Sequence, residues 1–511
     1  MNKLQEIFKA WNIAFDPNNE QAELAAKRIE ICNACDKKVT NLGINRCSVC
    51  GCALKGKVFS PVKGACPEGK WDEVDGVKEH RQVMIESVED KTIFVQIASY
   101  RDPQLTLTLE DLFNTADRPD DLTVCIAWQH SSEDEWDNLD KYKEDKRVVI
   151  LDIPAEQAKG ACWARNFIQQ HYTNQAFTLQ IDSHTRFIKG WDTELILMYE
   201  ELRQKGSQKP LITSYLPSYN PDNDPEERKD EVWKMTFNRF TPEGYIFTYP
   251  AVIEGWKNLN GPAPSRFFSA HFAFTTGQHC IEVPHDPNMY FHGEEPSLAS
   301  RSYTHGYDLF HPHKVIAWHF YTREGLKKHW DDHKNWNEID RQSHKRFRIL
   351  HKMEKAFIDE ALDVNNFGFG KERSLEDYEK FAGVRYKDRM VHQHVIDLHL
   401  PPNPFLNNPE EYEKGMRSKV KHCLNIHKDH FKHDDYTFWV ISFELNDGTN
   451  IIRLDADKKE LTSLLNNPEK DNFIKIWREF TGVMPDKWVI WPHSESKGYV
   501  ERYEEKMNFD G

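Results

Sequence analysis

The chain has 511 residues, about three times the length of a comfortable single domain, so we expect two or three domains. Its formal net charge of −15 argues against a surface that binds nucleic acid over its whole extent, although it is compatible with a local basic groove. No apolar run approaches the roughly 18 residues that cross a bilayer, and the first residues lack the layout of a signal peptide. We therefore expect no membrane partner and a cytoplasmic location, which would be the host cytoplasm if a phage encodes the chain.

Two helices are predicted at the start of the chain. Leu4, Ile7, Phe8 and Trp11 recur at helical spacing, and Asn19 is predicted to cap a second helix. We expect both helices to pack on the cysteine-rich segment that follows them.

Six of the ten cysteines lie close together in this segment. Cys32 and Cys35 form one CxxC motif, Cys47 and Cys50 form a second one, and eleven residues lie between the two motifs. Each motif places two thiolates one metal-ligand span apart, so the pair predicts a tetrahedral structural zinc site. Disulfides are less expected, because cytosolic thiols stay reduced.

The zinc ligand set has alternatives. A zinc ion takes four ligands, and Cys52 and Cys66 are two further thiols that can replace one of the first four. The segment from Cys32 to Trp71 resembles small zinc-ribbon modules of viral and phage proteins. We expect residues 1–80 to form one domain that acts as a structural staple or contacts a protein, and polar residues 68–90 to form a connector.

Four short apolar runs rich in β-formers come next, and helical patterns lie between them. The runs are 92–98, 122–128, 147–153 and 176–181. Strands that alternate with helices at this spacing predict an α/β domain with a mostly parallel sheet covered on both faces. Ligands of such sheets bind at the carboxyl ends of the strands.

Asp182 and His184 stand directly after the fourth predicted strand. Two such side chains at positions i and i+2 can converge on one cation, and a carboxylate with an imidazole suits Mn²⁺ better than Ca²⁺. The motif is common by chance, so its position at a strand end gives it its weight.

Five stretches strengthen this interpretation: IFVQIASYRDPQL, GACWARN, LQIDSHTRFIKGWD, FHGEE and RSLEDYEKFAGV. With them in this order from about residue 92 to 386, the chain resembles the family of GlcNAc-transferases that modify hydroxyproline or Ser/Thr in polypeptides. The resemblance implies a GT-A glycosyltransferase domain at 90–390, with a Rossmann-like, mostly parallel sheet. It also implies a UDP-sugar donor, with GlcNAc as the default sugar, a Mn²⁺ or Mg²⁺ cofactor, and transfer with retention of configuration.

Metal ligands follow from the same resemblance. Asp182 and His184 fall on two of them, and His319, ahead of an aromatic residue and an arginine, falls on the third. His311 and His313 are nearby alternatives.

Donor-binding residues are also implied. The segment that would hold uracil and ribose is Ser99, Tyr100, Arg101 and Asp102. Arg165 would close the nucleotide pocket beside Asp182, the alternative being an ion pair on a helix surface. Arg323 would lie over the diphosphate as a catalytic residue.

Glu294 and Glu295 match the acidic motif that faces the sugar and the acceptor. A carboxylate there can orient the attacking hydroxyl. The alternative is a simple helix start, where the helix dipole favours glutamate. No carboxylate stands out as a covalent nucleophile, so we prefer an attack from the leaving-group face, with the metal neutralising the departing diphosphate.

The last part of the chain, 391–511, has a different pattern. Alternating residues 435–445 and 449–454 flank an Asn-Asp-Gly turn and predict a β-hairpin within an α+β accessory domain. Trp477, Trp488 and Trp491 are expected to pack in its core rather than to stack on sugars. Residues 324–356 predict either a solvated helix or one wall of an acceptor groove.

Three function classes fit the sequence. The first is a glycosyltransferase whose acceptor is a polypeptide hydroxyl, either hydroxyproline or Ser/Thr. The second performs the same chemistry on a hydroxymethylated base of phage DNA, which the zinc ribbon favours and the acidic charge disfavours. The third is a non-catalytic carbohydrate-binding protein.

Overall fold

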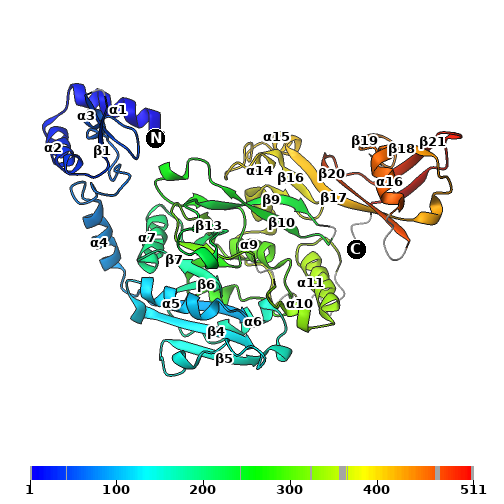
Figure 1. Cartoon of the computed structure of the whole chain (residues 1–511), viewed down its shortest axis with the longest axis horizontal. Coiled ribbons are helices and arrows are strands. Elements are labelled where there is room, and N and C mark those ends of the chain that lie inside the picture. The colour runs from blue at the N-terminus through cyan, green and yellow to red at the C-terminus, as the bar shows by residue number, and fades with distance from the viewer. Residues whose placement is uncertain are drawn as a thin grey trace.

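The computed structural model describes residues 3–41, 43–241, 243–322, 325–355, 364, 366–466 and 472–507. Figure 1 shows a small N-terminal unit on one side, a large central body, and a β-rich C-terminal unit on the other side. Helix α4 (Val77–Ser87) leads from the N-terminal unit into the central body and contacts α7 (Trp191–Gln204), so the expected connector contains a helix. Within the described residues, no helix is long and apolar enough to cross a membrane.

The N-terminal unit consists of three helices and a two-stranded hairpin. These are α1 (Lys3–Phe15), α2 (Asn19–Asn33), β1 (Lys38–Asn41), β2 (Ile44–Cys47) and α3 (Leu54–Lys57). The cap of α2 differs from the predicted one: Asn18, rather than Asn19, accepts a hydrogen bond from the Gln21 N–H and completes a capping box. Asn18 takes this place because it is the residue with extended backbone just before the first helical turn.

An eight-stranded sheet forms the centre of the molecule. Its strands, in spatial order, are β11 (Ala263–Pro264), β13 (Asp308–His311), β8 (Pro210–Thr213), β12 (Phe272–Thr276), β6 (Phe177–Asp182), β3 (Ile93–Tyr100), β4 (Leu122–His130) and β5 (Val148–Pro154). The last four, which include all four strands predicted from the sequence, pair in parallel. The predicted α/β fold with a mostly parallel sheet is confirmed.

Alternating side chains of β3 explain why helices cover both faces of this sheet. Val95 and Ile97 pack with apolar residues of α5 (Leu105–Thr115) and α7 on one face. Phe94 packs with α6 (Ala161–Gln169) on the other face. The carboxyl ends of β3 and β6 therefore lie side by side, with Ala98 paired to Asp182.

A second sheet joins the central body to the C-terminal unit. It contains β10 (Ile246–Val252), β9 (Trp233–Phe240), β17 (Met416–His427), β16 (Met390–His392) and β15 (Val384–Arg385), with β20 (Phe473–Gly482) paired to β17. Strands on both sides of the expected boundary at residue 391 thus share one sheet. The long strand β17 contributes Leu424 and Ile426 to the core of the C-terminal unit.

The C-terminal unit contains the predicted hairpin. Strands β18 (Tyr436–Glu444) and β19 (Asn450–Arg453) are antiparallel and lie in a sheet with β21 (Lys487–Ser494), β22 (Gly498–Tyr499) and β23 (Tyr503–Lys506), beside α16 (Lys458–Asn466). Trp488 is buried as expected, but Trp477 and Trp491 are 51% and 40% exposed. The core expectation is wrong for these two because each points outward in the alternation of its strand.

Short elements complete the central body. They are β7 (Thr185–Phe187), β14 (Ala317–His319), α8 (His279–Glu282), α9 (Glu294–Thr304), α10 (His329–Asp332), α11 (Trp336–Leu350), α13 (Leu375–Ala382), α14 (Gln393–Ile396) and α15 (Pro409–Lys414). The segment expected as a solvated helix or groove wall thus forms α10 and α11.

Candidate active site

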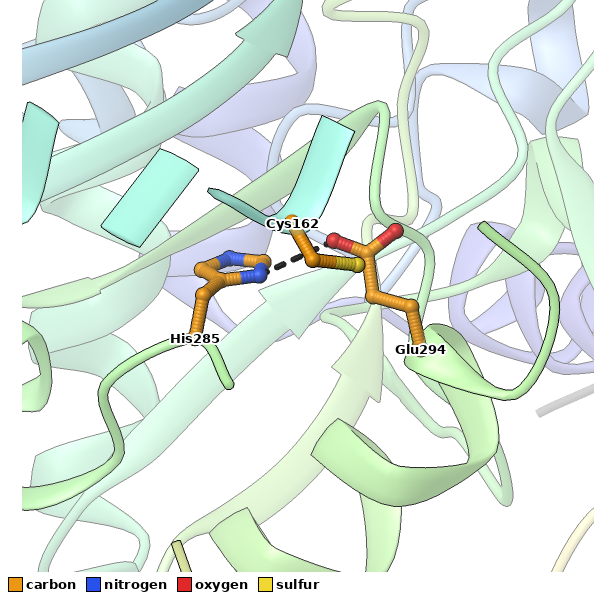
Figure 2. Close-up of side chains that lie close together, drawn as sticks. All are labelled: Cys162, His285 and Glu294. Carbon is orange, nitrogen blue, oxygen red and sulfur yellow. Dashed lines mark ion pairs between the residues drawn. The ribbon is translucent and has the colours of Figure 1, made fainter. Parts of the chain in front are cut away.

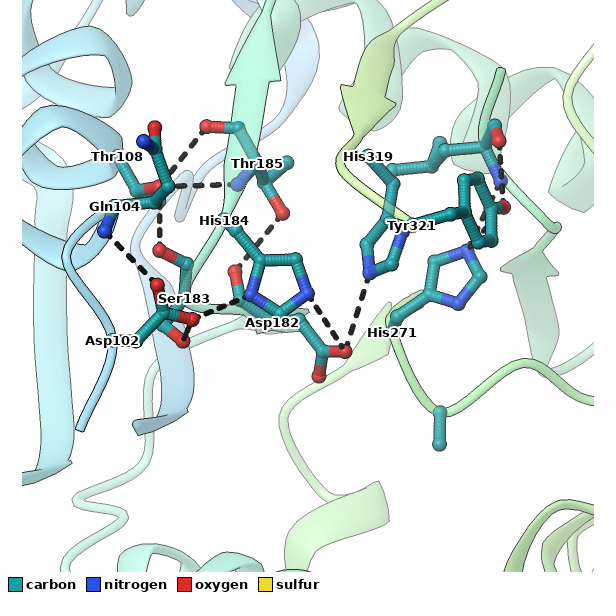
Figure 3. A network of polar contacts seen from close by, with 12 residues as sticks. Asp102, Gln104, Thr108, Asp182, Ser183, His184, Thr185, His271, His319 and Tyr321 are labelled. Atoms are coloured by element: carbon teal, nitrogen blue, oxygen red, sulfur yellow. Dashed lines mark hydrogen bonds and ion pairs between the residues drawn. The ribbon is translucent and has the colours of Figure 1, made fainter. Parts of the chain in front are cut away.

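Asp182, His184 and His319 lie together at the carboxyl end of β6 (Figure 3). Pairing of β7 with β14 sets His319 opposite Thr185, which brings it beside the Asp-Ser-His motif despite their distance in sequence. One ligand atom from each of the three residues lies within 4.8 Å of the others. Asp182 Oδ2 is 3.3 Å from His319 Nε2 and 3.7 Å from His184 Nε2.

The two alternative histidines lie elsewhere. His311 is buried, with its Nδ1 3.1 Å from the carbonyl oxygen of Thr213. Burial and the positive charges of Lys314 and Lys205 lower the pKa of His313 to about 3. Neither belongs to the cluster.

Asp102 lies behind His184 rather than on the cavity. Its Oδ2 is 2.6 Å from His184 Nδ1 and accepts a hydrogen bond of 2.7 Å from the Ser183 hydroxyl. The side chain is 1% exposed. This carboxylate fixes the imidazole and leaves Nε2 facing Asp182, as carboxylates behind metal-bound histidines do.

Arg165 is buried and bridges two carboxylates. It donates to Asp182 Oδ1 at 2.7 Å and to both oxygens of Glu294 at 2.8 Å. Burial alone would raise the pKa of Asp182, but the hydrogen bond with His319 and the charge of Arg165 hold it well below its ordinary value. Asp182 is therefore a carboxylate, the form that binds cations.

The first of two cavities that meet at this cluster has a volume of about 560 Å³. Its walls include Tyr100, Arg165, Asp182, His184, His319 and three residues of the α10 region, Lys328, His329 and Trp330. The Tyr100 hydroxyl and Arg101 donate to Asp332 Oδ2 at 2.7 and 3.0 Å, which ties α10 to the end of β3. Of the predicted nucleotide segment, Tyr100 lines the cavity, while Ser99 is fully buried.

The second cavity, of about 400 Å³, lies on the other side of the cluster. It shares Arg165, Asp182, Phe291, His319 and Tyr321 with the first cavity. Its other walls include Tyr215, Tyr245, Phe247, His271, His292, Glu294 and Glu295. A molecule in either cavity would therefore reach the carboxylate of Asp182 and the imidazole of His319.

The carboxylate of Glu294 is held in place by Arg165 and His285. Besides its bonds from Arg165, its Oε1 is 2.9 Å from His285 Nδ1, and Cys162 lies beside the pair (Figure 2). Burial would raise the pKa of Glu294, but Arg165 and His285 outweigh it and lower the pKa to about 2. Glu294 is therefore a permanent carboxylate whose oxygens are already engaged.

Glu295 has a different environment. It accepts hydrogen bonds from the Tyr215 hydroxyl at 2.7 Å and from the Ala270 N–H at 2.9 Å. Burial raises its pKa to about 7 despite these bonds. A carboxyl group with this pKa can exchange a proton with a bound hydroxyl at neutral pH.

His271 and Tyr215, which line the second cavity, were not predicted as site residues from the sequence. The His271 ring stacks on His319 with ring centroids 4.2 Å apart, and its Nε2 accepts the Leu216 N–H. No local pattern distinguishes His271 among the 24 histidines. The predicted residue Arg323 lies outside the described residues.

Five thiols surround a small cavity in the N-terminal unit, namely those of Cys32, Cys35, Cys47, Cys50 and Cys66. The Lys37 N–H donates to Cys35 Sγ at 3.4 Å, as in a CxxC knuckle. Cys52 does not line the cavity, and its Sγ lies 3.6 Å from the carbonyl oxygen of Cys50. Among the described residues, the three groups of possible ligand atoms found within 4.8 Å of one another lie outside this unit.

Comparison with known proteins identifies the class. A glycosyltransferase family model matches residues 92–146 and 137–388, which together are more than half of the chain. The protein is therefore a glycosyltransferase. The particular family is described as Glycosyltransferase (GlcNAc), and the chain belongs to it. No curated protein matches the sequence.

Solved structures to which the chain is similar include "GalNAc-T7 with UDP, GalNAc and Mn2+", at 12% identity and a TM-score of 0.42, covering 83% of this chain and 73% of that one. A structure of S. aureus TarS has 11% identity and a TM-score of 0.33, covering 81% of this chain and 77% of that one. S. aureus TarS 1–349 in complex with UDP-GlcNAc has 14% identity and a TM-score of 0.32, covering 54% and 71%.

Proposed function

We propose that the protein transfers a sugar, with GlcNAc as the expected group, from a UDP-sugar to a polypeptide hydroxyl of hydroxyproline or Ser/Thr. We further propose that the reaction is metal-dependent and retains the anomeric configuration. The observation that carries the proposal is the cluster of Asp182, His184 and His319 at the junction of two cavities in a chain of this family.

The donor set fits a divalent cation. One ionised carboxylate and two imidazoles that can each offer a nitrogen suit Mn²⁺, with Mg²⁺ as the alternative. When bound there, the cation would neutralise charge on the diphosphate of the donor and on the leaving group.

The residues around the cluster have separate tasks in this proposal. Tyr100 and the α10 region form the wall against which the nucleotide would lie in the first cavity. Arg165 keeps Asp182 ionised and oriented. The acceptor would enter the second cavity, where Glu295 can accept a hydrogen bond from its hydroxyl.

No covalent nucleophile is needed. Both Glu294 oxygens are held by Arg165, and Glu295 is held by Tyr215 and the Ala270 N–H. We therefore propose that the acceptor hydroxyl attacks from the face that the diphosphate leaves. We also keep the proposal that Arg323, which lies outside the described residues, acts on the diphosphate. For the N-terminal unit we propose a structural zinc ion bound by Cys32, Cys35, Cys47 and Cys50, with Cys66 as the replacement ligand.

The first test measures UDP release from UDP-sugars in Mn²⁺ by the full-length protein. Removing a metal-bound carboxylate removes stabilisation of the leaving charge, so Asp182→Ala should lower the rate at least about 100-fold. The matched control is Asp120→Ala, because the Asp120 side chain is 94% exposed. Equal rates in all three proteins contradict the metal site, and no release by the wild type favours a non-catalytic carbohydrate-binding protein.

The second test identifies the acceptor. A radiolabelled donor is offered to a hydroxyproline peptide, a Ser/Thr peptide and DNA that contains hydroxymethylated bases. Label on either peptide supports the proposal. Label on the DNA alone replaces it with the alternative acceptor.

A further inference from the structure

A second group of possible metal ligands lies at the rim of the 400 Å³ cavity. It consists of His292, just before α9, and Asp340 and His344 on α11. Asp340 and His344 are four residues apart, so they lie on the same face of the helix. One ligand atom from each of the three residues lies within 4.8 Å of the others.

Two buried polar atoms in this group make no hydrogen bond. They are Asp340 Oδ1 and His344 Nε2, which face each other at 3.6 Å. The two side chains are 15% and 9% exposed. A separation of 3.6 Å is too long for a hydrogen bond, and buried polar atoms are nearly always paired. Two such atoms that point at each other leave room for a shared partner between them.

The surroundings favour a cation as that partner. His344 Nε2 makes no hydrogen bond, so this ring nitrogen can offer its lone pair to a cation. The charge of Glu243 acts on all three residues. The nearby cation Arg348 is paired with Glu354 at 2.6 Å.

Tyr245 holds both imidazoles in place. Its ring stacks on His292 and on His344, with centroids 5.3 and 5.2 Å away. The Cys162, His285 and Glu294 group is less suited to bind a cation, because Arg165 already donates to both Glu294 oxygens.

We infer that His292, Asp340 and His344 bind one divalent transition-metal ion, for which zinc is the best match. Two imidazole nitrogens and one carboxylate oxygen are zinc ligands, and at bond lengths of about 2.1 Å in a tetrahedron such atoms lie about 3.4 Å apart. Three protein ligands leave one position open to water or to an oxygen of a molecule in the cavity. The bound ion would link α11 to the segment that leads into Glu294 and Glu295. The existence of this metal site does not depend on whether the protein transfers a sugar.

The test counts zinc in the full-length protein. All proteins carry Asp182→Ala, which weakens binding at the first cluster, and are equilibrated with Zn²⁺ and dialysed before elemental analysis. Adding Asp340→Asn or His292→Ala should each remove about one equivalent of zinc. Adding His171→Ala should remove none, because His171 is a half-buried histidine that belongs to none of the three groups of possible metal ligands found among the described residues.

His292 is exposed, so its replacement is expected to leave the fold intact, which circular dichroism checks. Loss of one equivalent in both the Asp340→Asn and His292→Ala proteins supports the site. A zinc content equal to that of the His171→Ala protein in either of them overturns it. Neither result depends on whether the protein transfers a sugar.

Discussion

Two adjacent glutamates show how strongly the environment of a residue decides its chemistry. Glu294 and Glu295 are neighbours in sequence, and Glu294 is buried while Glu295 is half-buried. A buried guanidinium and an imidazole hold Glu294 ionised, whereas Glu295 has only neutral hydrogen-bond donors. Their different pKa values therefore follow from partners supplied by distant segments.

Replacing Glu295 by glutamine is predicted to change the pH dependence of stability. Because the folded-state pKa is about 7, against an ordinary value of 4.5, the folded protein binds more protons between these pH values. The contribution of the Glu295 carboxyl group to the unfolding free energy of the wild type is therefore lost as the pH rises from 4.5 through 7. The unfolding free energy of Glu295→Gln relative to wild type should increase by about 2 kcal/mol from pH 5 to pH 8.

Urea denaturation of the metal-free protein at both pH values measures this difference. The control is Glu376→Gln, because Glu376 is 74% exposed. If the unfolding free energies of the two variants depended on pH in the same way, the pKa of Glu295 would not be raised in the folded protein.

Replacing Asp102 by asparagine is predicted to weaken metal binding without unfolding the protein. Asparagine keeps the size of the side chain but removes the charge that holds His184 Nδ1. Mn²⁺ affinity should fall about 10- to 100-fold, measured by paramagnetic resonance of free Mn²⁺. Asp152→Asn is the matched control, since Asp152 forms a similar 2.9 Å pair with His130 on the surface. An unchanged affinity in Asp102→Asn would mean that Asp102 does not support the ligand.

At the scale of elements, one strand pairing assembles the site. The short strands β7 and β14 bring His319 to Asp182, and α10 covers the adjoining cavity. The strands β3 and β6 could be predicted because their apolar runs are continuous and rich in β-formers. The short strands β7 and β14 have three residues each, too few for a pattern to predict their pairing.

Helix α10 offers a prediction at this scale. Asp332 accepts hydrogen bonds from Tyr100 and Arg101, so Asp332→Ala should release α10 from the end of β3. Loss of this preformed wall should weaken UDP binding about tenfold, equivalent to about 1.4 kcal/mol, in calorimetric titration. Glu338→Ala on α11 is the control and should bind as the wild type does. Equal affinity in Asp332→Ala would show that α10 is held by other contacts.

At the scale of the whole molecule, the C-terminal segment supports the central body. Arg266, which is buried, donates to the His399 carbonyl at 3.1 Å, and Val395 packs in a core with Phe237 and Phe240 of β9. Strand β17 then continues the sheet that contains β9 and β16. Residues beyond 391 are thus part of the packing of the central body.

Truncation tests this dependence. A chain that ends at residue 391 loses β17 and the core residue Val395, so its thermal midpoint should fall by about 10 °C or more, or the protein should aggregate. A chain that begins at residue 77 loses a unit with its own core of Ala25, Val58 and Trp71, and should unfold near the full-length midpoint. Differential scanning calorimetry measures the thermal midpoints of the two truncated chains and of the full-length chain. Normal unfolding of the chain that ends at 391 would contradict the shared packing.

Local patterns were enough to predict the parallel strands, the C-terminal hairpin and the Asp182 and His184 pair, because these features depend on apolar runs, turn residues and spacing. The resemblance to the GlcNAc-transferase family added His319 as the third expected metal ligand. By contrast, the folded arrangement of the chain was needed to see which carboxylate holds His184 and which glutamate stays ionised. It was also needed to see that His292, Asp340 and His344 lie together. Those properties depend on burial and on the charges of residues distant in sequence, and no local pattern of residues specifies either.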